Sequence, residues 1–290
     1  METPEERAGN RERPRGGVDA FDALSVRYRI GEGETAAVRE LLAEWAREHR
    51  EGDVRDLLPV EGVNLCTLFL EEGDTGPDGL VWYVEVVDDR APPWTDPAGA
   101  LRASPLFDAG LGELLASEPT VRADGVGGHR RVVVATHPDR QAWYEERGGR
   151  GLVAPVAGDE LPVEVAMVAV PLRAGAASRL TARLLAAINW LKRATSVSER
   201  FRDDVELLAE ERIYSESLLL GPGDGRQVLH YYMETEETDR LYDAFEASDD
   251  WEARLSEWLF RRLLERPEAM LEPPLESETV LVHAVDPERP

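Results

Sequence analysis

Three polar residues occupy every second position of one predicted strand: His230, Tyr232 and Glu234. Side chains two positions apart share one face of a strand, so this row spans about 14 Å at roughly 3.4 Å per residue. Such a row can supply a general base, a hydrogen-bond donor and an anion to one cavity. The sequence therefore indicates a small-molecule site, and if the site is catalytic, His230 is the base while Tyr232 and Glu234 orient the substrate.

The same row also has a structural interpretation, which we favour. His230 and Tyr232 would be hydrogen-bonded core groups, and Glu234 would pair with an arginine. Glu216, on the neighbouring predicted strand, joins the row if its side chain faces the same way, which the sequence leaves open.

A second row lies in the first half of the chain. Leu80, Trp82, Val84 and Val86 form the apolar set of a predicted strand, which leaves Tyr83 and Glu85 on the opposite face. Arg27 and Arg29 alternate with apolar residues on another strand, and they face the same interior or the solvent. If Glu85 forms an ion pair with one of these arginines, we favour a structural role for that pair, and an anion-binding site is the alternative. We include Tyr83 and Glu85 among the candidate ligand-binding residues.

These rows belong to an internal repeat. Ala103-Ser104-Pro105-Leu106-Phe107 matches Ala247-Ser248-Asp249-Asp250-Trp251 144 positions later, and a serine stands at the helix N-cap in both. Tyr83-Val84-Glu85 also matches Tyr232-Met233-Glu234, and each of these two segments follows a turn rich in Gly, Pro and Asp. Each half reads strand, helix, strand, strand, helix, strand, which is the ferredoxin-like plan of a four-stranded antiparallel sheet with two helices on one face.

The predicted domain organisation follows from this repeat. Residues 1–22 are expected to be a disordered tail, 23–137 the first ferredoxin-like half, 138–162 a linker rich in Gly and Pro, and 163–290 the second half.

The paired halves, the Tyr-x-Glu strand ends and the Ala-Ser-x-x-aromatic helix entries resemble the dimeric α/β-barrel superfamily. More narrowly, they resemble a family of small uncharacterised proteins that is frequent in salt-adapted archaea. The resemblance covers roughly residues 23–137 and 163–286. It implies an α+β fold in which two sheets pack face to face as a pseudo-dimer within one chain. The superfamily includes cofactor-free monooxygenases, haem enzymes and ligand binders, so the resemblance does not decide the activity.

The charge of the chain narrows its partners. The 290 residues carry a formal net charge of −25, and Lys192 is the one lysine. An acidic surface repels phosphate backbones, so we expect no nucleic-acid partner, and no apolar run is long enough to predict a membrane segment. Acidic charge with almost no lysine fits a salt-rich cytoplasm, where self-repulsion is screened. An ordinary acidic protein from a GC-rich genome is the alternative.

No motif indicates a metal or a cofactor. Cys66 excludes an internal disulfide, because it is the one cysteine, and we expect it to be a small buried hydrophobe. His49, His129, His137 and His283 show no metal-binding spacing. We expect neither metal nor cofactor.

We predict a monomer with an internal pseudo-two-fold, and association of several copies through exposed sheet edges stays open. The favoured function is a non-catalytic module that binds a small organic ligand or acts in assembly. The alternative is a cofactor-independent oxygenase or isomerase with its site inside the barrel.

Overall fold

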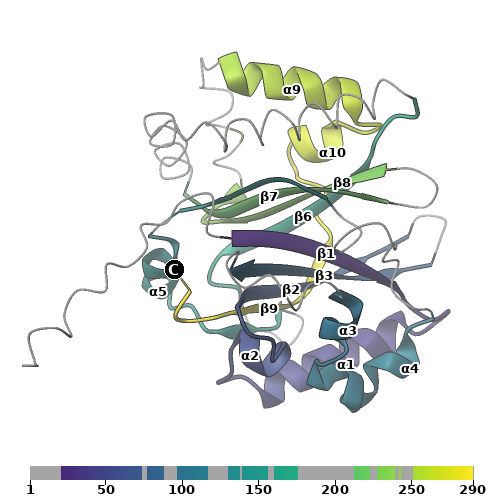
Figure 1. The fold of residues 1–290 in the computed structure, drawn as a ribbon, viewed down its shortest axis with the longest axis vertical. Helices are drawn as coiled ribbons and strands as arrows, with labels where there is room; N and C mark the ends of the chain where they lie inside the picture. The colour runs from purple at the N-terminus through teal and green to yellow at the C-terminus, as the bar shows by residue number, and fades with distance from the viewer. Residues whose placement is uncertain are drawn as a thin grey trace, which may run out of the picture.

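The fold is seen in a computed structural model, in which two β-sheets pack face to face with helices on their outer sides (Figure 1). The structure describes residues 21–73, 77–87, 97–116, 130–137, 139–155, 160–175, 212–222, 227–238, 242 and 251–289. The predicted tail lies outside these residues, except for its last two positions, which begin the first strand. The predicted first helix of the second half also lies outside them.

Within the described residues, one sheet has five strands and the other has four, and all pairs are antiparallel. The first sheet has the order β1 (Phe21–Arg29), β3 (Gly79–Val87), β2 (Val63–Glu71), β9 (Thr279–Val285) and β5 (Leu152–Val153). The second has the order β4 (Arg130–Thr136), β7 (Ile213–Pro222), β8 (Gln227–Thr235) and β6 (Glu164–Pro171).

The last strand of each predicted half lies in the sheet of the other half. β4 pairs with β7, and β9 pairs with β2. The expectation that each half closes its own four-stranded sheet is therefore wrong. Alternation of apolar and polar residues predicts that a segment is a strand, but it does not say which of two exposed edges the strand will join. The exchange ties the two halves together through backbone hydrogen bonds.

The two sheets also meet along their edges. β1 lies against β4, so the first sheet touches the second on one side. On the other side, the backbone N–H of Glu278, just before β9, donates to the carbonyl of Met167 on β6 at 2.8 Å. The space between the sheets is thus enclosed on two sides.

Helices cover the outer face of each sheet. The first sheet carries α1 (Thr35–Glu48), α2 (Val54–Leu57), α3 (Pro97–Leu101), η4 (Phe107–Leu111) and α4 (Gly112–Leu114), and the second carries α9 (Trp251–Leu263) and α10 (Glu268–Leu271) (Figure 1). The apolar stripe of α1 points inward, because Val38, Leu42 and Trp45 are all buried. No helix in the described ranges is long and apolar enough to cross a membrane.

The predicted serine cap is present in the first half. Ser104 Oγ accepts from the backbone N–H of Leu106 at 3.3 Å and donates to the carbonyl of Leu57 at 2.6 Å. The helix that follows is broken, since Gly110 has a φ of 109°, which side-chain-bearing residues rarely adopt. Its counterpart Ser248 lies outside the described residues.

The segment predicted as a linker contains regular structure. α5 (Arg140–Glu146) covers one end of the space between the sheets, and β5 pairs with β9. Apart from Pro138 and residues 156–159, this segment is described, and it is part of the folded unit.

The strand exchange predicts that the two halves fold only together. Fragments 21–155 and 160–290 should each lack a cooperative thermal transition, because each is missing the strand that pairs with its own second strand. An equimolar mixture should unfold cooperatively as a 1:1 complex, measured by circular dichroism and size-exclusion chromatography. The control replaces the first fragment with residues 21–129, which lack β4, and should give no complex. Cooperative unfolding of either fragment alone as a monomer would contradict the exchange.

Candidate functional site

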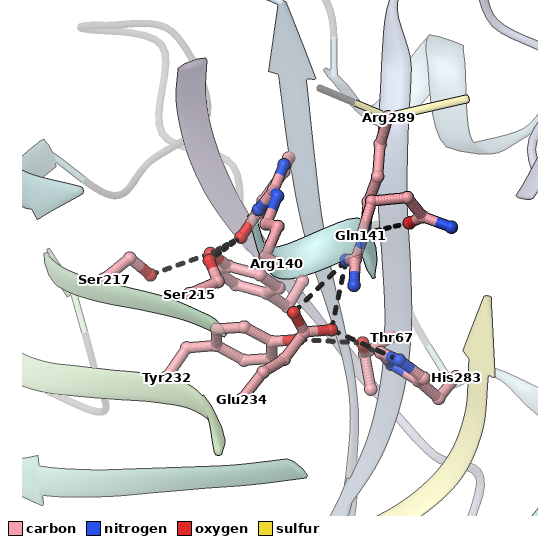
Figure 2. A network of polar contacts seen from close by, with 11 residues as sticks. Thr67, Arg140, Gln141, Ser215, Ser217, Tyr232, Glu234, His283 and Arg289 are labelled. Atoms are coloured by element: carbon pink, nitrogen blue, oxygen red, sulfur yellow. Dashed lines mark hydrogen bonds and ion pairs between the residues drawn. The ribbon is translucent and has the colours of Figure 1, made fainter. Parts of the chain in front are cut away.

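A group of polar side chains lies between the two sheets, where a protein core is usually apolar. The alternation of β3 and β8 puts their polar rows on the inner faces, as predicted, and puts Trp82 and Val84 under the helices. We call the group the inter-sheet network (Figure 2); its members are Thr67, Tyr83, Glu85, Arg140, Gln141, Ser215, Ser217, Tyr232, Glu234, His283 and Arg289.

Glu85 on β3 organises one side of the network. Its Oε2 accepts from Arg140 Nη1 at 2.9 Å, and both side chains are fully buried. Its Oε1 accepts from Tyr83 Oη at 3.1 Å and from the hydroxyl of Ser215. Ser217 on β7 in turn donates to Tyr83 Oη at 2.9 Å. Arginine and two hydroxyls thus compensate a carboxylate that has been taken out of water.

Glu234 on β8 organises the other side. Arg289 Nη1 lies 3.2 Å from its Oε2 and 3.3 Å from its Oε1. His283 Nε2 lies 3.2 Å from Oε1, and its Nδ1 is 3.0 Å from the hydroxyl of Thr67. That hydroxyl is also 3.5 Å from Tyr232 Oη. A hydroxyl, an imidazole and a carboxylate therefore lie next to one another, although Nε2 meets the carboxylate as a charge contact and not as a hydrogen bond among the described residues.

Aromatic rings fill the space between the two sides. The rings of Tyr83 and Tyr232 stack, with centroids 3.6 Å apart and planes 13° from parallel. Phe69 meets the Tyr232 ring edge-on, with centroids 6.1 Å apart. Burial raises the pKa of both tyrosines well above 10, so they stay neutral donors. Each tyrosine links its neighbours by hydrogen bonds and also packs like a core residue.

Glu234 is anionic at neutral pH. Burial opposes its ionisation, but the charge of Arg289 and the contact with His283 outweigh burial and lower its pKa to about 2. The centre of the molecule therefore holds a fixed negative charge that needs a cation beside it.

The two sides follow one plan. In each, a glutamate stands two residues after a tyrosine on the third strand of a half, and its arginine follows the fourth strand of the same half by four residues. A hydroxyl from the second strand of the other half contacts the tyrosine: Ser217 for Tyr83 and Thr67 for Tyr232. The sides differ in what else the carboxylate contacts: Glu85 accepts from Tyr83 and Ser215, whereas Glu234 lies against His283.

The structure brings together four of the six predicted site residues, Tyr83, Glu85, Tyr232 and Glu234. His230 is buried on the same face of β8, two residues before Tyr232, but it is not a member of the network defined above. Glu216 faces the other way, because Ser215 and Ser217 on either side of it point between the sheets.

The arginines expected beside Glu85 have other positions. Arg27 pairs with Glu71 near the end of β2, and Arg29 is exposed. Glu85 pairs instead with Arg140, which comes from the segment predicted to be a linker. Strand alternation correctly predicts that Arg27 lies on the same sheet face as Glu85. However, Arg27 lies opposite Val81, which is four residues along β3 from Glu85, so its side chain is too far away to pair with that carboxylate.

One sequence signal marks the residues that were missed. Pro138-Asp139-Arg140 and Pro287-Glu288-Arg289 repeat a proline, an acidic residue and an arginine just after the fourth strand of each half. Read together with the repeated Tyr-x-Glu, this motif pairs each glutamate with one arginine. His283, Thr67 and the two serines carry no such signal, because isolated polar residues in apolar strands are common.

Other features of the described residues offer less chemistry. No cluster of three His, Cys, Asp or Glu residues within them could hold a metal. Cys66 is buried between sheet and helices, and burial raises the pKa of its thiol, so the thiolate is disfavoured. A shallow hollow of about 350 Å³ lies between α1 and the η4–α4 segment, and none of its lining residues belongs to the network.

Comparison with known proteins gives distant structural likenesses. No protein-family model and no curated protein sequence matches the chain. A crystal structure from Fusobacterium nucleatum subsp. nucleatum, provisionally described as a monooxygenase, aligns over 92% of this chain and 95% of its own, with TM-score 0.47 and 6% identity.

A second crystal structure with the same description, from Lactobacillus acidophilus, covers 92% of this chain and 96% of its own, with TM-score 0.43 and 8% identity. An anthrone oxidase-like protein covers 92% of each chain, with TM-score 0.31 and 12% identity. At this distance, the contacts described above remain the basis for inferring what this chain does.

Glu278 and Glu234 should make the free energy of unfolding respond to pH in opposite directions. Burial and the nearby Glu71 raise the pKa of Glu278 to about 8 from an ordinary 4.5, so the folded state holds a proton that the unfolded state releases. Stability from Glu278 should therefore be complete below about pH 4.5 and lost as pH rises to 8, whereas stability from Glu234 should be lost as pH falls from 4.5 towards 2.

Glu278→Gln should remove a decline in unfolding free energy of about 1.4 kcal/mol per pH unit between about pH 5 and pH 8, measured by urea denaturation at constant salt. Glu44→Gln, at an exposed position of α1, is the matched control and should keep the decline. The assignment is wrong if the Glu278→Gln protein loses stability over this range as steeply as the wild type.

Proposed function

We propose that the protein is a non-catalytic module that binds a small organic ligand or acts in assembly. This proposal rests on one observation: the side chains that could react are already paired with one another. Glu85 and Glu234 are each neutralised by a buried arginine, and the tyrosine rings stack against each other. A catalytic group must be able to contact the substrate. The carboxylates and tyrosines of this network contact one another instead.

We further propose that the fold is the single-chain form of a dimeric α/β barrel. Each sheet combines three strands of one half with the fourth strand of the other. A Tyr-x-Glu on the third strand and a Pro-acid-Arg just after the fourth strand recur in both halves and occupy equivalent places in the network. An internal two-fold of this kind supports a monomer.

One observation favours a second candidate, a cofactor-independent oxygenase or isomerase. Thr67 and Glu234 place a hydroxyl and a carboxylate on either side of the His283 imidazole, which are the groups that a proton relay uses. In this candidate His283 is the base, a role that the sequence had suggested for His230. Substrate would need a path to a side chain that is fully buried.

Native and denaturing mass spectrometry distinguish these candidates on protein purified from a salt-adapted host. A binding module should give a monomer with an added mass that leaves on denaturation and is recovered unchanged after aerobic incubation. Gain of oxygen by that molecule, or its isomerisation seen as a changed chromatographic retention at unchanged mass, would support the enzyme instead if it is abolished in His283→Gln but not in His230→Gln. A bare mass in every preparation would contradict ligand binding and leave the assembly role, and a dimer would contradict the internal pairing.

We also propose that the protein works in a salt-rich cytoplasm, on the support of its net charge of −25. At molar salt the Debye length is about 3 Å, so repulsion among surface carboxylates is screened. The thermal midpoint should fall by about 10 °C or more when salt is lowered from about 3 M to 0.1 M, measured by differential scanning fluorimetry. Equal stabilisation by sucrose at low salt would show that charge screening is not the cause.

A further inference from the structure

Arg289 occupies its place between the sheets as a bound cation would. Its Nη1 contacts both oxygens of Glu234, and its Nε donates to Gln141 Oε1 at 3.1 Å. Its guanidinium carbon lies 5.2 Å from the centre of the Tyr144 ring. A carboxylate, an amide oxygen and an aromatic face are the groups that recognise a guanidinium or an alkylammonium ion. Figure 2 shows Arg289 reaching Glu234 beside Gln141.

The segment that carries Arg289 is short and lies outside both sheets. We call residues 286–289, which follow β9, the strap. Its backbone is tied to the sheet by Asp286, whose N–H donates to the carbonyl of Asn64 at 2.8 Å. The Asp286 carboxylate pairs at 2.8 Å with Arg55, which is more than half exposed, so this pair is weak. Arg55 also lies 3.8 Å from the Glu288 carboxylate. Opening the strap would break these three ties together with the ion pair between Arg289 and Glu234.

The equivalent arginine is held differently. Arg140 is the first residue of α5, and its backbone N–H donates to the carbonyl of His137 at 3.1 Å. Withdrawing Arg140 would require displacing a helix. Of the two buried carboxylates, Glu234 is therefore the one whose cation is carried by a segment outside the helices and strands.

Arg289 also matches its site incompletely. Among the described residues, its Nη2 is buried without a hydrogen-bond partner. A buried donor without an acceptor costs free energy, so the bound state of the strap is less favourable than a full match would be. A ligand that uses fewer donors, or brings its own acceptor, can compete with Arg289.

We propose that Glu234, Gln141 and Tyr144 form a binding site for a small organic cation, a guanidinium or a primary amine, which Arg289 occupies until the ligand displaces the strap. This inference rests on the proposed binding function and names its ligand class. It explains how a filled interior is compatible with binding.

The test is chemical rescue of Arg289→Ala with ethylguanidinium. The variant leaves Glu234 without its arginine, so its thermal midpoint should drop, and about 10 mM ethylguanidinium should raise it again by about 3 °C or more. Wild type should show a smaller rise, because ethylguanidinium must displace Arg289 before it can bind. Arg289→Ala with Glu234→Gln should show no rise either, since the anion is gone. Tetramethylammonium, which cannot donate hydrogen bonds, is the control cation.

Asp286→Ala keeps the test decisive if Arg289→Ala does not fold. This variant loosens the strap and retains Arg289, so ethylguanidinium should bind it at least tenfold more tightly than wild type by isothermal titration calorimetry. Absence of rescue together with equal affinity of the Asp286 variant and wild type would overturn the cation site. Rescue without any ligand in native preparations would keep the site and refute only the proposed binding function.

Discussion

Two carboxylates buried between the sheets set the requirement that the rest of the structure meets. Moving an ionised carboxylate out of water is costly, and only a close cation with further hydrogen bonds offsets the cost. Glu85 and Glu234 each pair with an arginine. In both pairs the glutamate lies on a strand of one sheet and the arginine follows a strand of the other sheet. Each ion pair is thus a clamp across the two sheets, reinforced by Ser217 on Tyr83 and Thr67 on Tyr232.

The strand exchange brings each arginine close enough to its glutamate to form these ion pairs. A fourth strand that stayed in its own sheet would deliver its Pro-acid-Arg segment to the wrong side of the glutamate. Because β4 lies in the second sheet, Arg140 arrives facing Glu85 on β3 of the first, and β9 does the same for Arg289 and Glu234. Topology and buried charge therefore depend on each other. The interior is consequently polar, and its charged groups are bonded to one another.

Local pattern was sufficient to predict part of this arrangement. The inner faces of β3 and β8 follow from alternation, because the pleat imposes a period of two wherever a strand forms. The orientation of Glu216 did not follow, since nothing anchored the register of β7. The partners of the glutamates cannot be predicted from local pattern either. Arg140 lies in the segment predicted to be a linker, and these arginines reach their carboxylates only because each fourth strand joins the sheet of the other half.

A double-mutant cycle on Glu85 and Arg140 tests most directly whether the sheets depend on these clamps. Glu85→Leu and Arg140→Leu should each lower the free energy of unfolding by about 3–5 kcal/mol, because each leaves an uncompensated buried charge. The double variant, which buries no charge at this position, should lose much less than the sum, and the coupling would be measured by urea denaturation at constant salt. Additive losses would contradict the account, since they would mean that the two groups do not stabilise each other across the interface.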